Sequence, residues 1–218
     1  MAQTGLLFVG AVLFINGLSL LGYVKGKSLV PMDIFVGLLQ VITPLYLIFT
    51  ATGTPAEISS TILLGSGLFL FGFTYLYVAI NNIYDLDGSG LGWFCLYVVL
   101  AAIAYAYFNF KTATPAGNVL TVLWISWAYL WFLFWLVLSL GRTSLTRYTG
   151  AVCATQGIIT GFIPALILIG QPDLFTNELA IAIAVVGIAL NVIYFQTVRP
   201  KPATSEPATS EPATSSAY

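Results

Sequence analysis

The sequence predicts an all-α membrane protein with seven transmembrane helices. Of its 218 residues, 59% are hydrophobic and only 7% are charged, whereas about 25% are charged in an ordinary soluble domain. A chain of this composition cannot cover a water-facing surface with polar side chains, so its solvent is lipid. The apolar residues also occur in runs of about 20, the length of helix that crosses a bilayer core about 30 Å thick.

Charged residues, glycines and prolines divide the apolar sequence into seven spans. The first span begins almost at Met1, has no basic segment before it and is followed by further spans, so it is predicted to be a membrane helix and not a cleaved signal peptide. Pro44 and Pro164 fall inside spans and are expected to kink them. The predicted spans are 4–23, 31–51, 61–84, 91–110, 117–140, 149–170 and 178–198.

Basic residues predict the orientation of the chain. Six of the seven lie in the loops and tail that follow odd-numbered spans, and only Lys111 lies on the other side. Basic residues favour the cytoplasmic side, so we expect an external N-terminus and a cytoplasmic C-terminus. The last residues, 199–218, repeat PATSE and are predicted to be a disordered cytoplasmic tail, because they cannot bury enough apolar area to offset the entropy of ordering.

Several kinds of function are excluded by what the spans lack. The chain has no histidine, and Cys95 and Cys153 lie in apolar runs without CxxC spacing, so we expect no metal site and no cofactor. There is no basic run to bind nucleic acid. Every ionisable side chain lies in a loop or near a span end, Asp33 and Asp85 included, which argues against ion pumps, proton relays and a retinal Schiff base. Without histidine or a buried acid, we expect no catalytic residues and no enzyme.

The polar residues inside the spans are neutral, for example Asn16, Thr74 and Asn81. Such groups commonly form hydrogen bonds between helices. They can also line a route for an uncharged solute that forms hydrogen bonds, and would offer no site to an ion. The residues by themselves leave both interpretations open.

Aromatic residues follow two helical stripes. Trp124, Trp127, Trp131 and Trp135 are spaced i, i+3, i+7 and i+11, and Phe71 and Tyr75 are spaced i, i+4. Facing each other, the stripes would form a slot for a flat amide or urea, with indole N–H and tyrosine O–H groups as donors to its carbonyl oxygen. The alternative is that the indoles pack against helices or lipid.

Four segments resemble the AmiS/UreI family of urea channels and amide transporters. They are GAVLFING at 10–17, FGFTYLYVAIN at 71–81, WISWAYLW at 124–131 and QGIITGFIPA at 156–165. The resemblance implies three two-helix hairpins around a pore in each protomer, and six protomers in a ring with lipid at its centre. It also implies passive flux of urea or short aliphatic amides across a bacterial inner membrane. By motif position it places Phe71, Tyr75, Trp124, Trp127 and Trp131 at pore constrictions and Asn16 on the pore lining.

Two departures from the family pattern affect what is expected. Where the acid-gated urea channel of this family has a glutamate, this chain has Gln156, which cannot titrate and which we take as a further pore residue. We therefore expect flux that changes little between about pH 5 and pH 8. The seventh span and the tail resemble the amide-transporter branch of the family, so the chain is expected to add one C-terminal helix to the three hairpins.

The sequence is compatible with three functions. The first is a passive channel or facilitator for urea and short-chain amides that supplies a cytoplasmic urease or amidase. The second is a scaffold or sensor partner that transports nothing, in which the indoles only pack. The third is an energy-coupled amide transporter, which the lack of buried charge argues against.

Overall fold

The protein is described here by a computed structural model that covers residues 2–198. The tail predicted over 199–218 lies outside these residues. Within them every regular element is a helix. The α-helices are α1 (Ala2–Leu20), α2 (Val30–Phe49), α3 (Pro55–Tyr84), α4 (Ser89–Phe110), α5 (Pro115–Leu138), α6 (Thr146–Gln156), α7 (Ile163–Gly170) and α8 (Asn177–Thr197). The short elements are the 3-10 helices η1 (Gly26–Leu29), η2 (Thr143–Leu145) and η4 (Pro172–Leu174) and the π-helical segment η3 (Gly157–Phe162).

Seven helical segments in the described residues are long and apolar enough to cross a membrane. One of them combines η1 with α2, and another runs from η2 through α7. The predicted all-α class with seven membrane helices is therefore confirmed. The largest differences in bounds are in the third span, expected to begin at 61 and beginning at Pro55, and in the sixth, expected to begin at 149 and beginning at Thr143.

The early start of α3 has a local cause. Thr54 caps the helix: its Oγ1 accepts a hydrogen bond from the backbone nitrogen of Glu57 at 3.4 Å, and the Glu57 carboxylate accepts one from the backbone nitrogen of Thr54 at 2.8 Å. This reciprocal pair satisfies two N–H groups that a helix start leaves free. Pro55 follows at the first helical position, where its missing N–H costs nothing. The α3 helix is consequently about 45 Å long, longer than a bilayer core is thick.

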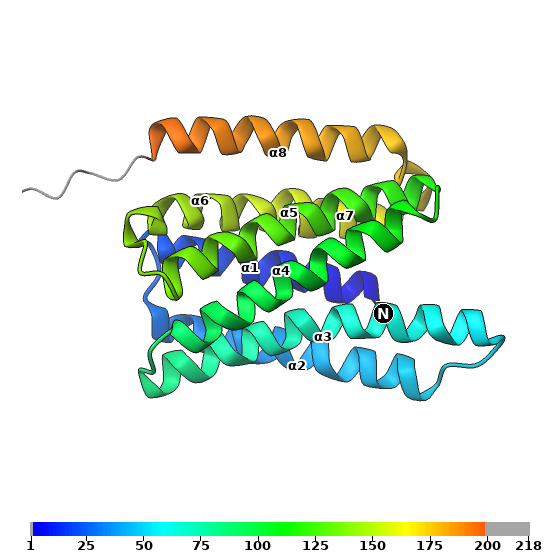
Figure 1. The fold of residues 1–218 in the computed structure, drawn as a ribbon, viewed down its shortest axis with the longest axis horizontal. Helices are drawn as coiled ribbons and strands as arrows, with labels where there is room; N and C mark the ends of the chain where they lie inside the picture. Colours follow the sequence, from blue (N-terminus) through cyan, green and yellow to red (C-terminus); the bar gives the residue numbers. More distant parts are fainter. Residues whose placement is uncertain (1, 199–218) are drawn as a thin grey trace, which may run out of the picture.

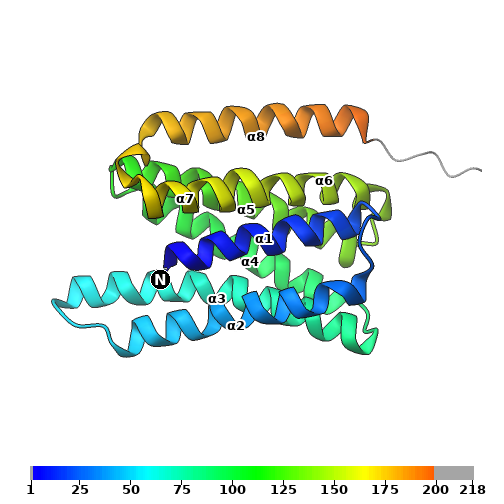
Figure 2. The same ribbon diagram turned by 180° about the vertical axis from the view of Figure 1, so that it is seen from behind.

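The helices lie roughly side by side along the long axis of the molecule (Figure 1). Two pairs are consecutive hairpins, α2 with α3 and α4 with α5. The third pair joins α1 to the sixth span, formed by α6, η3 and α7, although the two are far apart in the sequence. The α8 helix lies outside these three pairs and packs against α5 and α6 (Figure 2).

Glycines allow the first and sixth spans to pack backbone against backbone. A Cβ atom added at Gly10 would lie 2.6 Å from the carbonyl oxygen of Gly157 and 2.7 Å from the backbone nitrogen of Phe162. Gly161 also contacts Gly10. The GxxxG pair formed by Gly157 and Gly161 is thus at a close helix crossing, as such pairs commonly are in membranes.

The sixth span is irregular where it crosses α1. Its α-helical hydrogen bonding changes to the π pattern over η3, directly before Pro164. Because proline has no N–H to donate, the helix cannot keep its regular bonding through this turn. The kinks expected at Pro44 and Pro164 stay predictions: a π-helical segment precedes Pro164, whereas α2 is α-helical through Pro44.

The outer surface of the bundle is strongly apolar. Large hydrophobic side chains such as Phe35, Phe49 and Ile188 are more than 60% exposed. On α8 only Ala180 and Ile183 are buried. Such faces are unfavourable in water, so lipid or other subunits must cover them.

The expectation that no acid is buried is wrong for Asp33. This residue lies in the first turn of α2, near the end of the span as the sequence indicates, yet its side chain is 0% exposed. The amide nitrogen Nδ2 of Asn16 donates a hydrogen bond to its Oδ1 at 2.7 Å. Position along a span can be predicted from the sequence, but cover by neighbouring helices cannot.

Candidate functional site

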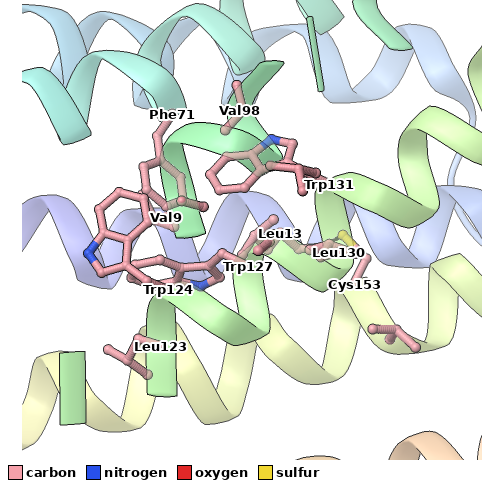
Figure 3. Close-up of a cluster of buried hydrophobic side chains, with 14 of the residues drawn as sticks. Val9, Leu13, Phe71, Val98, Leu123, Trp124, Trp127, Leu130, Trp131 and Cys153 are labelled. Carbon is pink, nitrogen blue, oxygen red and sulfur yellow. Dashed lines mark hydrogen bonds between the residues drawn. The ribbon is translucent and has the colours of Figure 1, made fainter. Parts of the chain in front are cut away.

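A cluster of aromatic rings closes the middle of the bundle between α3 and α5. The ring centroid of Phe71 lies 5.9 Å from that of Trp124, 4.9 Å from that of Trp127 and 4.8 Å from that of Trp131. All four side chains are at most 8% exposed. Figure 3 shows Phe71 between the indoles of Trp124 and Trp127 and that of Trp131. We call these four residues the aromatic constriction.

Two indoles of the constriction are fixed by further contacts. The Nε1 of Trp127 donates a hydrogen bond to the Oγ1 of Thr160 on η3 at 2.9 Å, and that hydroxyl in turn donates to the carbonyl oxygen of Gln156 at 2.6 Å. Trp124 stacks on Tyr105 of α4 with centroids 4.4 Å apart, and the Tyr105 hydroxyl donates to the carbonyl oxygen of Leu63 at 2.9 Å. The expectation that indole N–H groups serve the solute is wrong for Trp127, whose N–H has a protein partner.

Cavities lie on both sides of the aromatic constriction. One, of about 500 Å³, is lined by Asn16, Tyr75 and Trp131 and reaches the loop at Asp85. We call it the basic-end cavity, because its end of the bundle also carries Lys25, Lys27, Arg142 and Arg147. The other, of about 420 Å³, is lined by Trp124 and Tyr105 and reaches Ala2, so we call it the N-terminal-end cavity. Phe71 and Trp127 line both cavities, so the constriction is what separates them.

The lining of both cavities is almost free of charge. No Asp, Glu, Lys or Arg lines the N-terminal-end cavity within the described part of the chain. The basic-end cavity has one carboxylate on its described lining, Asp85, whose Oδ2 forms an exposed ion pair with the Nζ of Lys27 at 2.7 Å. Asp33, although buried nearby, lines neither cavity. No charged side chain of the described residues lies at the constriction itself.

Neutral polar groups in the basic-end cavity have unused hydrogen-bonding capacity, and Asn16, Tyr75 and Asn81 are among them. The hydroxyl of Tyr75 is buried and has no hydrogen-bond partner among residues 2–198. Asn16 uses its amide nitrogen on the carbonyl oxygen of Val12 at 3.0 Å and on Asp33, whereas its Oδ1 has no bond to any described residue. The hydroxyl of Thr74, by contrast, donates to the carbonyl oxygen of Leu70 at 2.7 Å. The cavity thus keeps a hydroxyl donor and an amide oxygen acceptor.

The predicted site residues divide into two groups. Those that line one or both of these cavities are Asn16, Phe71, Tyr75, Trp124, Trp127 and Trp131. Gln156 lines neither of these two cavities. Its Nε2 donates to the carbonyl oxygen of Ser126 at 2.9 Å, and it lines a third cavity of about 450 Å³ between α5, α6 and α8.

Sequence reasoning did not identify three further residues of the site. Tyr105 and Thr160 fix two of the indoles, and Asp33 fixes Asn16. Each acts on a residue of a different helix, and spacing within one helix cannot show such contacts. Trp135, by contrast, belongs to the predicted stripe but not to the constriction. Its ring packs on Trp93 and Phe132 and lies apart from Phe71.

Relatives of this chain are transporters and channels. The model of the AmiS/UreI family transporters matches residues 1–171, which ends before α8. A protein of Mycolicibacterium smegmatis named for the transport of amidate substrates is 44% identical over 207 residues, 94% of this chain and 93% of that protein. The acid-activated urea channel of Helicobacter pylori is 32% identical over 189 residues, 76% of this chain and 96% of the channel.

A solved structure has the same fold. The closed state of the Helicobacter pylori urea channel, determined by cryo-electron microscopy, matches with a TM-score of 0.72 at 30% identity and covers 79% of this chain and 99% of the channel. The match to the Mycolicibacterium protein covers 94% of this chain, which is more than the chain without α8 contains. The aligned part of that protein therefore includes a segment that corresponds to α8. Two helical hairpins, a pair formed by the first and sixth spans and an uncharged aromatic constriction agree with these similarities, and the chain belongs to the AmiS/UreI family of transporters.

Proposed function

We propose that this protein is a passive channel or facilitator for urea and short-chain aliphatic amides. One observation carries the proposal: two cavities of about 500 and 420 Å³ meet at the aromatic constriction, and no charged side chain of the described residues lies there. A solute that crosses must leave its water behind and pass between flat rings. Small, planar and uncharged molecules meet that requirement at the lowest cost.

The polar groups of the basic-end cavity suit an amide. A primary amide has a carbonyl oxygen that accepts hydrogen bonds and N–H groups that donate them, and the cavity offers the Tyr75 hydroxyl and the Asn16 Oδ1. A hydrated ion would lose its water and gain no opposite charge, which costs far more than these neutral contacts return. Amides are therefore expected to cross and ions to be excluded.

The rings of the constriction must move for a solute to pass, because Phe71 contacts three indoles. Trp127 and Trp124 are fixed by Thr160 and Tyr105. Trp131 has no hydrogen bond to another described side chain, and it lines the basic-end cavity. We propose that Phe71 and Trp131 give way while Trp124 and Trp127 form the fixed wall.

The distribution of basic residues and the family resemblance suggest how the protein is oriented in the membrane and how it assembles. Basic residues at the end with the Asp85 loop favour a cytoplasmic position for the basic-end cavity. The solute would then reach a cytoplasmic urease or amidase by diffusion. The exposed apolar faces of the bundle are compatible with a ring of six protomers and enclosed lipid, which the family resemblance implies.

The channel is further proposed not to open on acidification. The only carboxylate on the described lining of either cavity, Asp85, is paired with Lys27 at the mouth, and Gln156 is neutral. No histidine is present to titrate near pH 6.

Solute flux into vesicles tests the proposal. The full chain is reconstituted in liposomes, and the permeability to urea, formamide, acetamide and propionamide is measured by stopped-flow light scattering against protein-free liposomes. A channel raises these permeabilities and carries no ionic current. A scaffold raises none of them, and accumulation of acetamide against its gradient, abolished by an uncoupler, would instead identify an energy-coupled transporter.

A further inference from the structure

We propose that Asp33 is a positioning residue that, together with the carbonyl oxygen of Val12, holds the Asn16 carboxamide with its oxygen toward the permeating solute. It does so from behind the pore wall, since Asp33 lines neither cavity whereas Asn16 lines the basic-end cavity. The consequence is selectivity for solutes that carry N–H groups. This inference rests on the proposed function and assigns a source of its specificity.

The orientation of the Asn16 carboxamide follows from its two contacts. The same atom lies 3.0 Å from the carbonyl oxygen of Val12 and 2.7 Å from the Oδ1 of Asp33. A backbone carbonyl oxygen can only accept a hydrogen bond, so this atom must be the amide nitrogen, which has two hydrogens to donate. Both hydrogens are thereby used, and the nitrogen has nothing left for a solute.

The oxygen end of the Asn16 carboxamide remains available for a hydrogen bond in the cavity. The Oδ1 of Asn16 has no hydrogen bond to a described residue, and Asn16 is only half buried. Asn16 thus presents an acceptor and no donor. A solute N–H can bond to it, whereas a second carbonyl oxygen or an ether oxygen cannot.

Burial of an aspartate at position 33 is energetically unfavourable. Its side chain is fully buried, and its Oδ2 has no partner in the described part of the chain. Burial of a polar group without a full set of hydrogen bonds is costly, so an aspartate here calls for a compensating role. Its position in the first turn of α2, where helix N–H groups favour a negative side chain, reduces that cost.

A carboxyl group can hold the amide nitrogen of Asn16 because it accepts a hydrogen bond in either protonation state. As a carboxylate, Asp33 accepts through both oxygens; with a proton on Oδ2, its Oδ1 still accepts from Asn16. An alanine offers no acceptor, and an asparagine offers its own Oδ1. These two substitutions therefore separate the loss of the acceptor from the loss of the acid.

The experiment compares solutes with different numbers of N–H groups. Acetamide, N-methylacetamide and N,N-dimethylacetamide carry two, one and none, and their permeabilities are measured in proteoliposomes of the full chain after subtraction of protein-free liposomes. The readout is the permeability ratio of acetamide to N,N-dimethylacetamide in wild type, Asp33→Ala and Asp33→Asn. Asn177→Ala is the matched control, since Asn177 accepts a hydrogen bond from Asn118 between α5 and α8, away from both cavities.

We expect Asp33→Ala to lower the ratio about fivefold, the factor that one neutral hydrogen bond contributes, and Asp33→Asn and Asn177→Ala to stay within about twofold of wild type. A wild-type ratio in Asp33→Ala would overturn the inference. So would an equal fall in Asp33→Ala and Asp33→Asn, because the acceptor would then not be the deciding feature.

A structure of the Asp33→Ala variant gives an independent test, with size-exclusion chromatography confirming that the variant is folded. The inference requires that the Asn16 carboxamide turns when its second acceptor is removed. An Asn16 whose Nδ2 stays on Val12 with Oδ1 still toward the cavity would contradict it. If wild-type protein passes no amide at all, the proposed function fails, and this structure still decides whether Asp33 orients Asn16.

Discussion

The Nε1 of Trp127 donates a hydrogen bond of 2.9 Å to the Oγ1 of Thr160. Thr160 is 0% exposed and lies in η3, the π-helical segment whose glycines pack against α1. The aromatic constriction is therefore linked to the irregular part of the sixth span. Segments of π-helix are frequent at functional sites, and here the irregular turn carries the acceptor that fixes an indole of the aromatic constriction.

Replacement of Thr160 by valine tests this link. Thr160→Val removes the acceptor and leaves the Trp127 N–H buried without a partner, which we expect to lower the free energy of unfolding by about 1–3 kcal/mol. Thr160→Ser keeps the hydroxyl and should retain most of the stability. Thermal unfolding in detergent measures both. Equal midpoints for valine and serine would contradict a stabilising role of the bond.

The number of helices could be predicted from the sequence because lipid imposes a length on every span. The helix starts do not follow from charge alone: the predicted spans leave Thr54 and Glu57 in a loop, but these residues form the capping box of α3. The T-x-x-E pattern was a signal for that start. The pairing of the first span with the sixth depends on contacts between residues such as Gly10 and Gly157, about which apolar runs say nothing.

The aromatic constriction is expected to set the size limit for the solute. Trp131→Ala removes a ring 4.8 Å from Phe71, and we expect the permeability of butyramide relative to acetamide to rise about tenfold, corresponding to about 1.4 kcal/mol of barrier. Trp135→Ala is the matched control, because this indole of the same helix packs on Trp93 instead. Stopped-flow light scattering on both variants measures the ratio. A wild-type ratio in Trp131→Ala, or the same change in both variants, would argue against the constriction.

The aromatic part of the site could be predicted because helical spacing places residues on one face of a helix. Phe71, Trp124, Trp127 and Trp131 follow that rule and meet. Trp135 lies on the same face but further along α5, where the neighbouring residue is Trp93 of α4. Spacing predicts the direction of a side chain and leaves its partner undetermined, which is also why the contact of Asp33 with Asn16 required the structure.

The close crossing of α1 and the sixth span predicts a strong effect of a single methyl group. At Gly10 an added Cβ would lie 2.6 Å from a backbone oxygen and 2.7 Å from a backbone nitrogen, which cannot move as a side chain can. We expect Gly10→Ala to lower the free energy of unfolding by about 1–3 kcal/mol. Gly170→Ala is the control, since no atom lies within 4 Å of its added Cβ. Thermal unfolding should separate the two variants, and equal stability would show that the helices can separate without cost.

Acid would protonate the carboxylates outside the membrane spans, and Asp87 is one of them. In the loop between α3 and α4, hydrogen bonds from Ser89, including a backbone N–H at 2.6 Å, lower the pKa of Asp87 from its ordinary value. A lowered pKa in the folded state adds stability above the unfolded pKa of about 4, and this stability is lost as pH falls through the folded value. The contribution of Asp87 is therefore complete throughout the range from about pH 5 to pH 8.

Within that range we expect acetamide flux to change by less than about twofold, because Asp85 at the cavity mouth is paired with Lys27 and Asp33 accepts from Asn16 in either protonation state. Proteoliposomes equilibrated at each pH on both sides give the profile, and the Asp33→Asn variant gives its control. A steep rise in acid would contradict the prediction. If Asp33→Asn then abolished that rise, the buried carboxyl behind Asn16 would be the group that titrates.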